Sequence, residues 1–176
     1  IDPSIIFSFA GGNSMDSFID QYYPSSVFGT MAYFRIGGTT NREKRGILGF
    51  HTGTNLYGRN ILSASMYVNL YQISQTPIND CTAFAHKVTK IWYESDVNWT
   101  IAESGSSWAQ AGGDFEEENY QSRSKVLPNS VSENRNFNWT YFDVSYAFKS
   151  HFMTLSPDTY DKGFIIKLRD LPATET

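Results

Sequence analysis

The sequence predicts an all-β domain, an antiparallel β-sandwich of the jelly-roll type with one short helix. Apolar and polar residues alternate over several short segments, which is the period of a strand with one buried and one solvent-facing side. Turns rich in Gly, Pro and Asn separate these segments at fairly regular intervals. Aromatic residues are abundant, with 13 Phe, 11 Tyr and 4 Trp among 176 residues, and only 18% of the residues are charged.

The clearest alternation runs over residues 61–71. Its apolar side chains, Leu62, Ala64, Met66, Val68 and Leu70, are expected to face the core. A helix would scatter these side chains around its circumference. By the same reasoning, the predicted strands cover residues 4–10, 16–21, 31–36, 45–50, 61–71, 82–89, 136–144 and 163–169.

Two segments interrupt the strands. Asp143 is expected to cap a short helix, because Val144, Phe148 and Phe152 recur at four-residue spacing. Residues 116–133 are polar and begin with three glutamates, so we expect a long surface loop.

Residues 1–176 are expected to form a single domain, because no linker and no internal repeat is visible. The alternating Ile5, Phe7 and Phe9 indicate an additional strand within residues 1–13, which either pairs in its own sheet or is donated to a neighbouring chain. Residues 171–176 are expected to be a frayed tail. The chain begins at Ile1, so both a processed mature form and a fragment are open.

Charge and hydropathy disfavour two classes of partner. The net charge is −4 and no basic patch is present, which disfavours nucleic acid. No run of about 18 apolar residues exists, so we expect no membrane insertion.

A single cysteine, Cys81, forms no internal disulfide and is expected to be a small apolar filler. Few charges together with many Ser, Thr, Asn, Gly and Tyr are typical of extracellular β-proteins.

The sequence shows no assembled catalytic set. His51, His86 and His151 lie in no metal-ligand pair, and no nucleophile elbow or phosphate loop occurs. His86 is in phase with Phe84 and Val88, so a core or edge histidine is expected. The protein is therefore expected not to be an enzyme.

Residues 90–115 hold three of the four tryptophans. Trp92 and Trp99 are expected in the core, because each indole carries a large apolar surface and one N–H that needs a partner. Trp108 stands in a Gly- and Ser-rich stretch and is expected to be more open, as a candidate ligand-binding residue.

An outward row of aromatic and polar side chains is the main candidate ligand site. If the apolar face of residues 61–71 is buried, the opposite side of this strand and of residues 31–36 faces solvent. Aromatic rings beside Asn and Arg suit sugar recognition, and equally suit a protein interface; a plain solvated face is the third reading. The candidate residues are Tyr33, Arg35, Tyr67, Asn69 and Tyr71.

Several motifs together resemble the DNRLRE domains, which are related to disaggregatase-type domains and to some alginate-binding carbohydrate modules. The resemblance spans about residues 15–168 and is strongest over 87–114. The matching segments are Met15 to Ile19, Pro24 to Gly29, Ala32 to Gly37, Arg45 to Phe50, Ile61 to Val68, Val88-Thr89 with Trp92, Val97-Asn98-Trp99, Trp108, Gly112-Gly113-Asp114, Phe142 to Ser145 and Gly163 to Lys167. Gly49 departs from the family pattern, which has Arg there. The resemblance implies a secreted, non-catalytic jelly roll.

A structural Ca²⁺ is a candidate cofactor, because jelly-roll carbohydrate modules often hold one. Asp114 beside two glycines, and Asp16, are the candidate ligands. The triplets beginning at Asn98 and Asn138 match the glycosylation sequon, although both lie on or beside predicted strands.

Two functions stay open. The first is a non-catalytic extracellular module, of the carbohydrate-binding or adhesion type, whose partner is a polysaccharide. The alternative is a self-assembling subunit of a surface filament, fibre or virus particle, whose partners are identical subunits. Both place the protein outside the cell, at a cell surface or on a virion surface.

Overall fold

The computed structural model describes residues 14–50, 60–70, 81–117, 122–126, 138–146, 149 and 162–168. Within these ranges lie nine strands: β1 (Ser14–Asp20), β2 (Lys44–Phe50), β3 (Ser65–Leu70), β4 (Cys81–Lys87), β5 (Ile101–Glu103), β6 (Ser106–Ser107), β7 (Ser122–Val126), β8 (Asn138–Asp143) and β9 (Phe164–Leu168).

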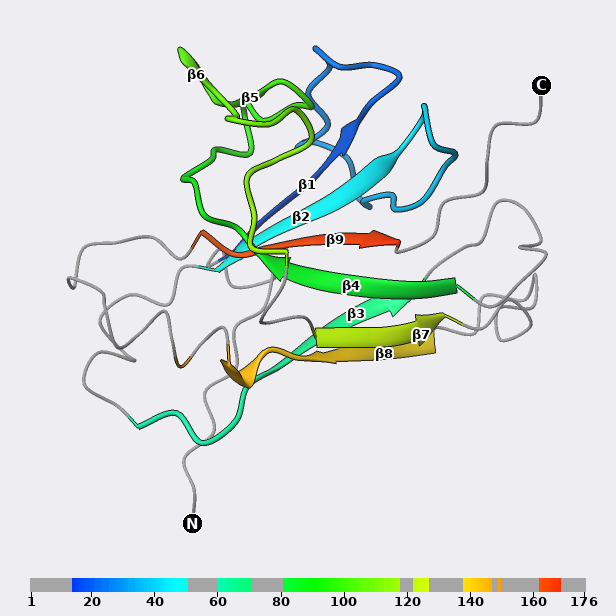
Figure 1. The fold of residues 1–176 in the computed structure, drawn as a ribbon, viewed down its shortest axis with the longest axis vertical. Coiled ribbons are helices and arrows are strands. Elements are labelled where there is room, and N and C mark those ends of the chain that lie inside the picture. Colours follow the sequence, from blue (N-terminus) through cyan, green and yellow to red (C-terminus); the bar gives the residue numbers. More distant parts are fainter. Residues whose placement is uncertain are drawn as a thin grey trace.

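The strands form one large sheet and two small ones (Figure 1). The large sheet has the order β1-β2-β9-β4-β7, β3 pairs with β8, and β5 pairs with β6. Every pairing between these strands is antiparallel. The prediction of an all-β, antiparallel fold is confirmed.

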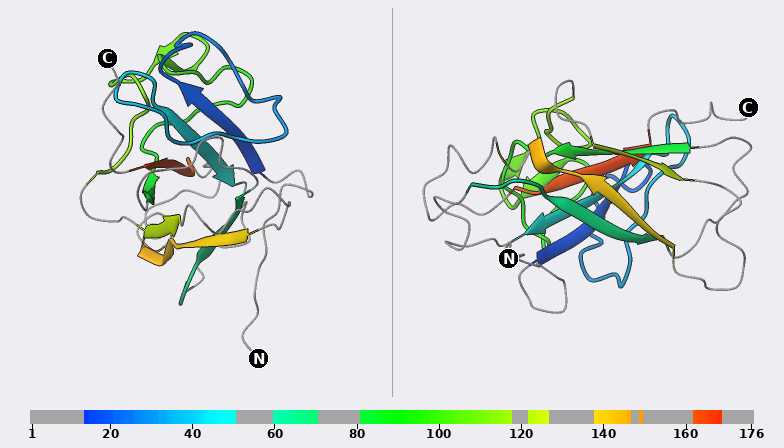
Figure 2. Two further views of the ribbon diagram at one scale, coloured as in Figure 1. Left: turned by 90° about the vertical axis from the view of Figure 1, so that its right-hand side faces the viewer. Right: turned by 90° about the horizontal axis from the view of Figure 1, so that it is seen from below.

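The β3–β8 pair packs on one face of the five-stranded sheet. Its inward residues Met66 and Phe142 form a buried cluster with Leu48, Phe164 and Ile166 of the sheet. Two sheets therefore share a core, as a β-sandwich requires. Figure 2 shows the two layers from the side. The jelly-roll connectivity stays a prediction.

Residues 88–115 cover the opposite face of the five-stranded sheet. They contribute a second buried cluster with Ile19, Ile47 and Ile165 of the sheet; the covering residues are Val88, Trp92, Val97, Trp99, Ala102 and Trp108. Alternation along β9 divides the two clusters, since Ile165 faces this layer while Phe164 and Ile166 face the β3–β8 pair. The described part of the molecule thus has a sheet buried on both sides.

The tryptophans of the covering segment satisfy their N–H groups with backbone carbonyls. The Trp92 indole donates to the Lys162 carbonyl at 2.8 Å, just before β9. The Trp108 indole donates to the Asn98 carbonyl at 2.9 Å. Because these bonds lie inside the packed layer, the indoles are held in the core without an unpaired donor.

Asn98 closes a tight turn inside this layer. Its side-chain oxygen accepts hydrogen bonds from the backbone N–H groups of Thr100 and Ile101 and from the Thr100 hydroxyl, at 2.9–3.0 Å. The residue is only 4% exposed. In the folded chain, the Asn98 side chain of this sequon is therefore buried and stabilises a turn.

Gly113 brings the covering segment close to β9. It has a φ of +100°, and a Cβ there would lie 2.3 Å from Cδ1 of Ile165. Both the backbone conformation and the contact exclude a side chain at this position.

The strand predictions over 16–21, 45–50, 61–71, 82–89, 136–144 and 163–169 are confirmed in β1, β2, β3, β4, β8 and β9, although β3 is shorter than expected. Asp143 does cap a helical turn: Ser145, Tyr146 and Lys149 are helical, and the Ser145 N–H donates to the Asp143 carboxylate at 3.0 Å.

Two predictions were wrong. Residues 31–36 alternate but form no strand; the ring of Phe34 instead covers Gly46 of β2, where a Cβ would lie 2.4 Å from it. Residues 116–133 were expected to be loop, but they contain β7, which pairs with the free edge of β4. The expected strand at 4–10 and the tail at 171–176 lie outside the described residues.

Replacing Trp92 by Ala should cost about 3–5 kcal/mol of unfolding free energy, because it removes a fully buried ring and leaves the Lys162 carbonyl without its donor. The neighbouring Tyr93 is exposed, so Tyr93→Ala is the matched control and should change stability by less than about 1 kcal/mol. Urea denaturation measures both. Equal losses in the two variants would contradict the assignment of the Trp-rich segment to the core.

Candidate functional site

Two tyrosines stand side by side on the outer face of the β3–β8 pair. Tyr67 and Tyr141 are direct cross-strand partners, and their ring centroids lie 6.2 Å apart at an interplanar angle of 39°. Because the adjacent Met66 and Phe142 point into the core, alternation turns both tyrosines outward. They are 63% and 62% exposed. We call this pair the tyrosine platform.

One exposed polar group follows the platform on β8. Asp143 is exposed, and the Ser145 hydroxyl and backbone N–H hold the pKa of its carboxyl below the ordinary value. Asn69 follows Tyr67 by two residues, but its side-chain oxygen is buried and has no hydrogen-bond partner among the described residues. The platform thus combines two ring faces with the Asp143 carboxylate, whereas the Asn69 oxygen is not open to solvent.

The predicted strand over residues 61–71 is longer at both ends than β3. Leu62 was expected to face the core with Met66, but it lies before β3 begins and is exposed. This expectation was wrong, because the alternation of the sequence extends past the paired strand. Tyr71, the last residue of the predicted row, lies outside the described residues.

Tyr33 and Arg35 do not belong to the platform. Both lie in the connection between β1 and β2, where Arg35 donates to the Tyr33 hydroxyl at 3.1 Å. Figures 1 and 2 show this connection at the opposite end of the molecule from β3 and β8. The single outward row expected from the sequence is therefore two separate surfaces.

Trp108 was expected to be the most open tryptophan of its segment, and this was wrong. It is 5% exposed and lies in the same buried cluster as Trp92 and Trp99. The Gly- and Ser-rich stretch around it folds back over the sheet. Its indole face is therefore covered by protein in the folded chain.

The two candidate cation ligands do not come together. Both carboxylate oxygens of Asp114 accept backbone N–H groups, from Ala109 and Gln110, at 2.9–3.0 Å. Asp16 lies on β1 near Glu94. In the described ranges, no three His, Cys, Asp or Glu side chains form a group that could hold a metal ion. A calcium site thus stays a prediction, without a ligand set in this part of the chain.

Asp16 and Glu94 are two carboxyl groups with raised pKa values. Burial raises the pKa of Asp16 above its ordinary value. Burial and, second, the charge of Asp16 raise the pKa of Glu94. Two carboxylates that are partly buried near each other are stabilised by protons, or by a cation.

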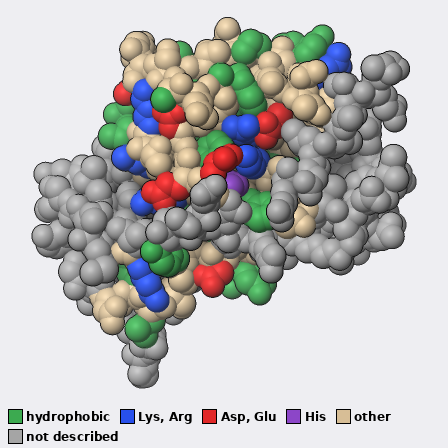
Figure 3. All heavy atoms as spheres, in the orientation of Figure 1, with side chains coloured by type: hydrophobic (Ala, Val, Ile, Leu, Met, Phe, Trp, Pro, Cys, Tyr) green, Lys and Arg blue, Asp and Glu red, His purple; other side chains and the backbone are tan. Residues whose placement is uncertain are grey.

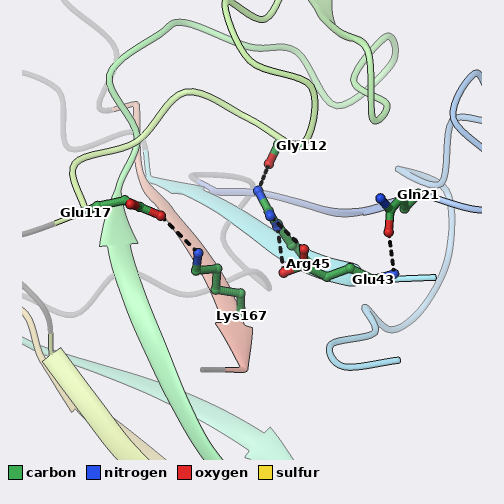
Figure 4. A network of polar contacts seen from close by, with 6 residues as sticks. All are labelled: Gln21, Glu43, Arg45, Gly112, Glu117 and Lys167. Atoms are coloured by element: carbon green, nitrogen blue, oxygen red, sulfur yellow. Dashed lines mark hydrogen bonds and ion pairs between the residues drawn. The ribbon is translucent and has the colours of Figure 1, made fainter. Parts of the chain in front are cut away.

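A network of charges crosses the face that residues 88–115 cover. Figure 4 shows Arg45, which donates to both carboxylate oxygens of Glu43 and to the Gly112 carbonyl. The Arg45 guanidinium also lies 4.8 Å from the Trp99 ring and 5.4 Å from the Phe115 ring. These contacts hold the covering segment against β2, so the Arg45 side chain has a structural role.

His86 lies beside this network, since the charges of Lys167, Glu117 and Arg45 all act on its pKa. Figure 3 shows acidic and basic side chains gathered near the centre of this view. It is 3% exposed, which confirms the expectation of a core histidine. Its Nδ1 lies 3.2 Å from the Glu116 carbonyl, whereas its buried Nε2 has no partner among the described residues. Burial is the main cause that lowers the pKa of His86, so the ring is neutral at pH 7.

No protein-family model matches the chain. No curated protein sequence matches it significantly either. The resemblance to DNRLRE domains therefore stays an expectation from motif order. In the part of the chain that the structure describes, no helix is long and apolar enough to cross a membrane.

Sequence reasoning overlooked Tyr141 as a site residue. The alternation of residues 138–143 placed it on one side of a strand, but only the pairing of β8 with β3 shows that it stands beside Tyr67. It also overlooked Tyr22, Tyr23 and Arg42, which lie with Tyr33 in the β1–β2 connection.

Asp16→Asn should raise the melting temperature at pH 7 and give no gain at pH 3. A raised pKa means that the folded state binds a proton more tightly than the unfolded state, so wild-type stability falls as the pH rises above about 4. The variant has no such loss. Glu103→Gln on β5 is the control for a carboxylate elsewhere in the fold. A melting temperature that rises with added Ca²⁺ in the wild type, but not in Asp16→Asn, would instead identify Asp16 as a cation ligand.

Proposed function

We propose that this protein is a non-catalytic extracellular binding module that holds a polysaccharide on the tyrosine platform. The observation that carries the proposal is the exposed cross-strand pair of Tyr67 and Tyr141. Both rings are more than three-fifths exposed and stand side by side on paired strands, so their faces are open to a ligand.

The chemistry of the platform suits sugars. A sugar ring has apolar C–H faces and hydroxyl edges, so aromatic rings bind its faces and polar side chains bind its edges. The tilt of 39° keeps the rings from stacking on each other, which leaves both open to a ligand. The exposed Asp143 carboxylate supplies acceptors for hydroxyl groups.

A binding role rather than catalysis is supported by the state of the nearby carboxylate. A glycosidase requires a pair of carboxyl groups, one of them protonated. Asp143 is held ionised, and the pair with raised pKa values, Asp16 and Glu94, lies on β1 and the covering segment instead. The resemblance to DNRLRE domains points the same way, to a secreted accessory module.

The second candidate is the self-assembling structural subunit. One observation favours it: exposed aromatic residues occur at two opposite ends of the molecule, on the platform and on the β1–β2 connection. Complementary surfaces at opposite ends produce head-to-tail polymers. Size-exclusion chromatography with light scattering separates the two candidates, since a strict monomer at all concentrations contradicts self-assembly.

Binding to a panel of immobilised polysaccharides should weaken about tenfold in Tyr67→Ala and in Tyr141→Ala, because each change removes one ring of the platform. Tyr93→Ala removes an exposed ring on the covering segment, away from the platform, and should bind like the wild type. Affinity electrophoresis measures all three. The proposal fails if no neutral or acidic polysaccharide retards the wild type, or if the control loses as much affinity as the platform variants.

A further inference from the structure

The β1–β2 connection, residues 21–43, concentrates exposed apolar side chains. In the described part of the chain, ten large hydrophobic residues are exposed, and half of them belong to this one connection. They are Tyr22, Tyr23, Val27, Met31 and Tyr33. A gathering of this kind on a soluble domain is typical of an interaction surface.

Two arginines in the same connection lie within cation–π distance of these rings. The Arg42 guanidinium is 4.5 Å from the Tyr22 ring centroid, and that of Arg35 is 5.3 Å from the Tyr33 ring centroid. Neither arginine forms an ion pair with any described carboxylate, whereas the nearby Lys44 and Arg45 are paired with Asp20 and Glu43. Both arginines are exposed, and one N–H of Arg35 is used by the Tyr33 hydroxyl. Because each guanidinium carries five N–H donors, donors remain for a partner as far as the described residues show.

The connection is also held in shape before any partner binds. The Phe28 ring stacks on Phe18 of β1 at 4.2 Å, which anchors its middle to the sheet. The Gln21 N–H donates to the Glu43 carbonyl, and the Glu43 N–H donates to the Gln21 side chain, which closes its base (Figure 4). Gly29 packs directly on the Glu94 backbone. A partner thus meets an ordered surface and loses less entropy on binding.

We propose that residues 21–43 form a docking surface for a partner protein that presents carboxylates beside aliphatic side chains. Tyr, Arg and Met are the residues that carry binding energy in protein interfaces. The free guanidinium donors fit carboxylates, and two cations on a chain of net charge −4 attract an acidic segment to this end. Val27 and Met31 offer a sugar no hydrogen bond, which favours a protein over a polysaccharide.

This inference is independent of the tyrosine platform. The connection and the β3–β8 pair lie at opposite ends of the molecule, so both can be occupied at once (Figure 2). A module that holds a polysaccharide at one end and a protein at the other would link the two.

A selection of random peptides displayed on phage tests the docking surface with the full chain as bait. The selected peptides should be enriched in Asp and Glu next to Leu, Val or aromatic residues. We would synthesise the selected peptides and measure their affinity for two variants, the double substitution Arg35→Ala/Arg42→Ala and the single substitution Tyr22→Ala. Each variant should bind the peptides about tenfold more weakly than the wild type. Lys149→Ala removes an exposed cation elsewhere and should bind like the wild type. Equal melting temperatures show that the variants keep their fold.

Several outcomes would overturn the proposal. One is a selection without acidic enrichment, or peptides that bind the arginine variants as tightly as the wild type. Another is loss of polysaccharide retardation in Arg35→Ala/Arg42→Ala, which would assign this surface to a glycan. A third is a wild type that self-associates in light scattering and an arginine variant that does not, which would assign it to a second copy of the chain. Tyr67→Ala should leave peptide binding unchanged. The experiment therefore distinguishes failure of the polysaccharide proposal from failure of the docking proposal.

Discussion

The burial of β9 on both faces is the constraint on which the rest of the structure depends. Ile165 faces the Trp-rich segment, while Phe164 and Ile166 face the β3–β8 pair, and all three are buried. Removing apolar surface from water stabilises by about 25 cal/mol for each Å², and each layer covers only the side chains on its own face of β9. The five-stranded sheet therefore needs both layers, and each layer is held to β9 or to its immediate neighbours.

This arrangement separates the scaffold from the surfaces that remain for binding. On one face of the five-stranded sheet, the tryptophans and Arg45 hold the covering segment in place. Trp92 donates to the Lys162 carbonyl, and Arg45 donates to the Gly112 carbonyl. On the other face, the β3–β8 pair covers the sheet with Met66 and Phe142, which turns Tyr67 and Tyr141 to solvent. The same alternation that forms the core thus produces the tyrosine platform.

Local alternation predicted the fold class and most of the strands because the period of two is imposed by one buried face. It failed at residues 31–36, where Phe34 covers Gly46 and the backbone does not pair, and at β7, where polar residues pair with an edge of β4. Side-chain direction was predictable for Tyr67. Its neighbour in the candidate site, Tyr141, depends on a pairing between strands far apart in the sequence. The burial of Trp108 depends likewise on how its segment folds back.

Native-state hydrogen exchange tests the doubly covered strand most directly. The amides of Phe164, Ile165 and Ile166 should exchange only through global unfolding, with the same free energy as that from urea denaturation. The amides of β3 and β8, which lie in the outer layer, should open at lower free energy. Slower exchange in β3 than in β9, or exchange of β9 well below the global free energy, would contradict the account.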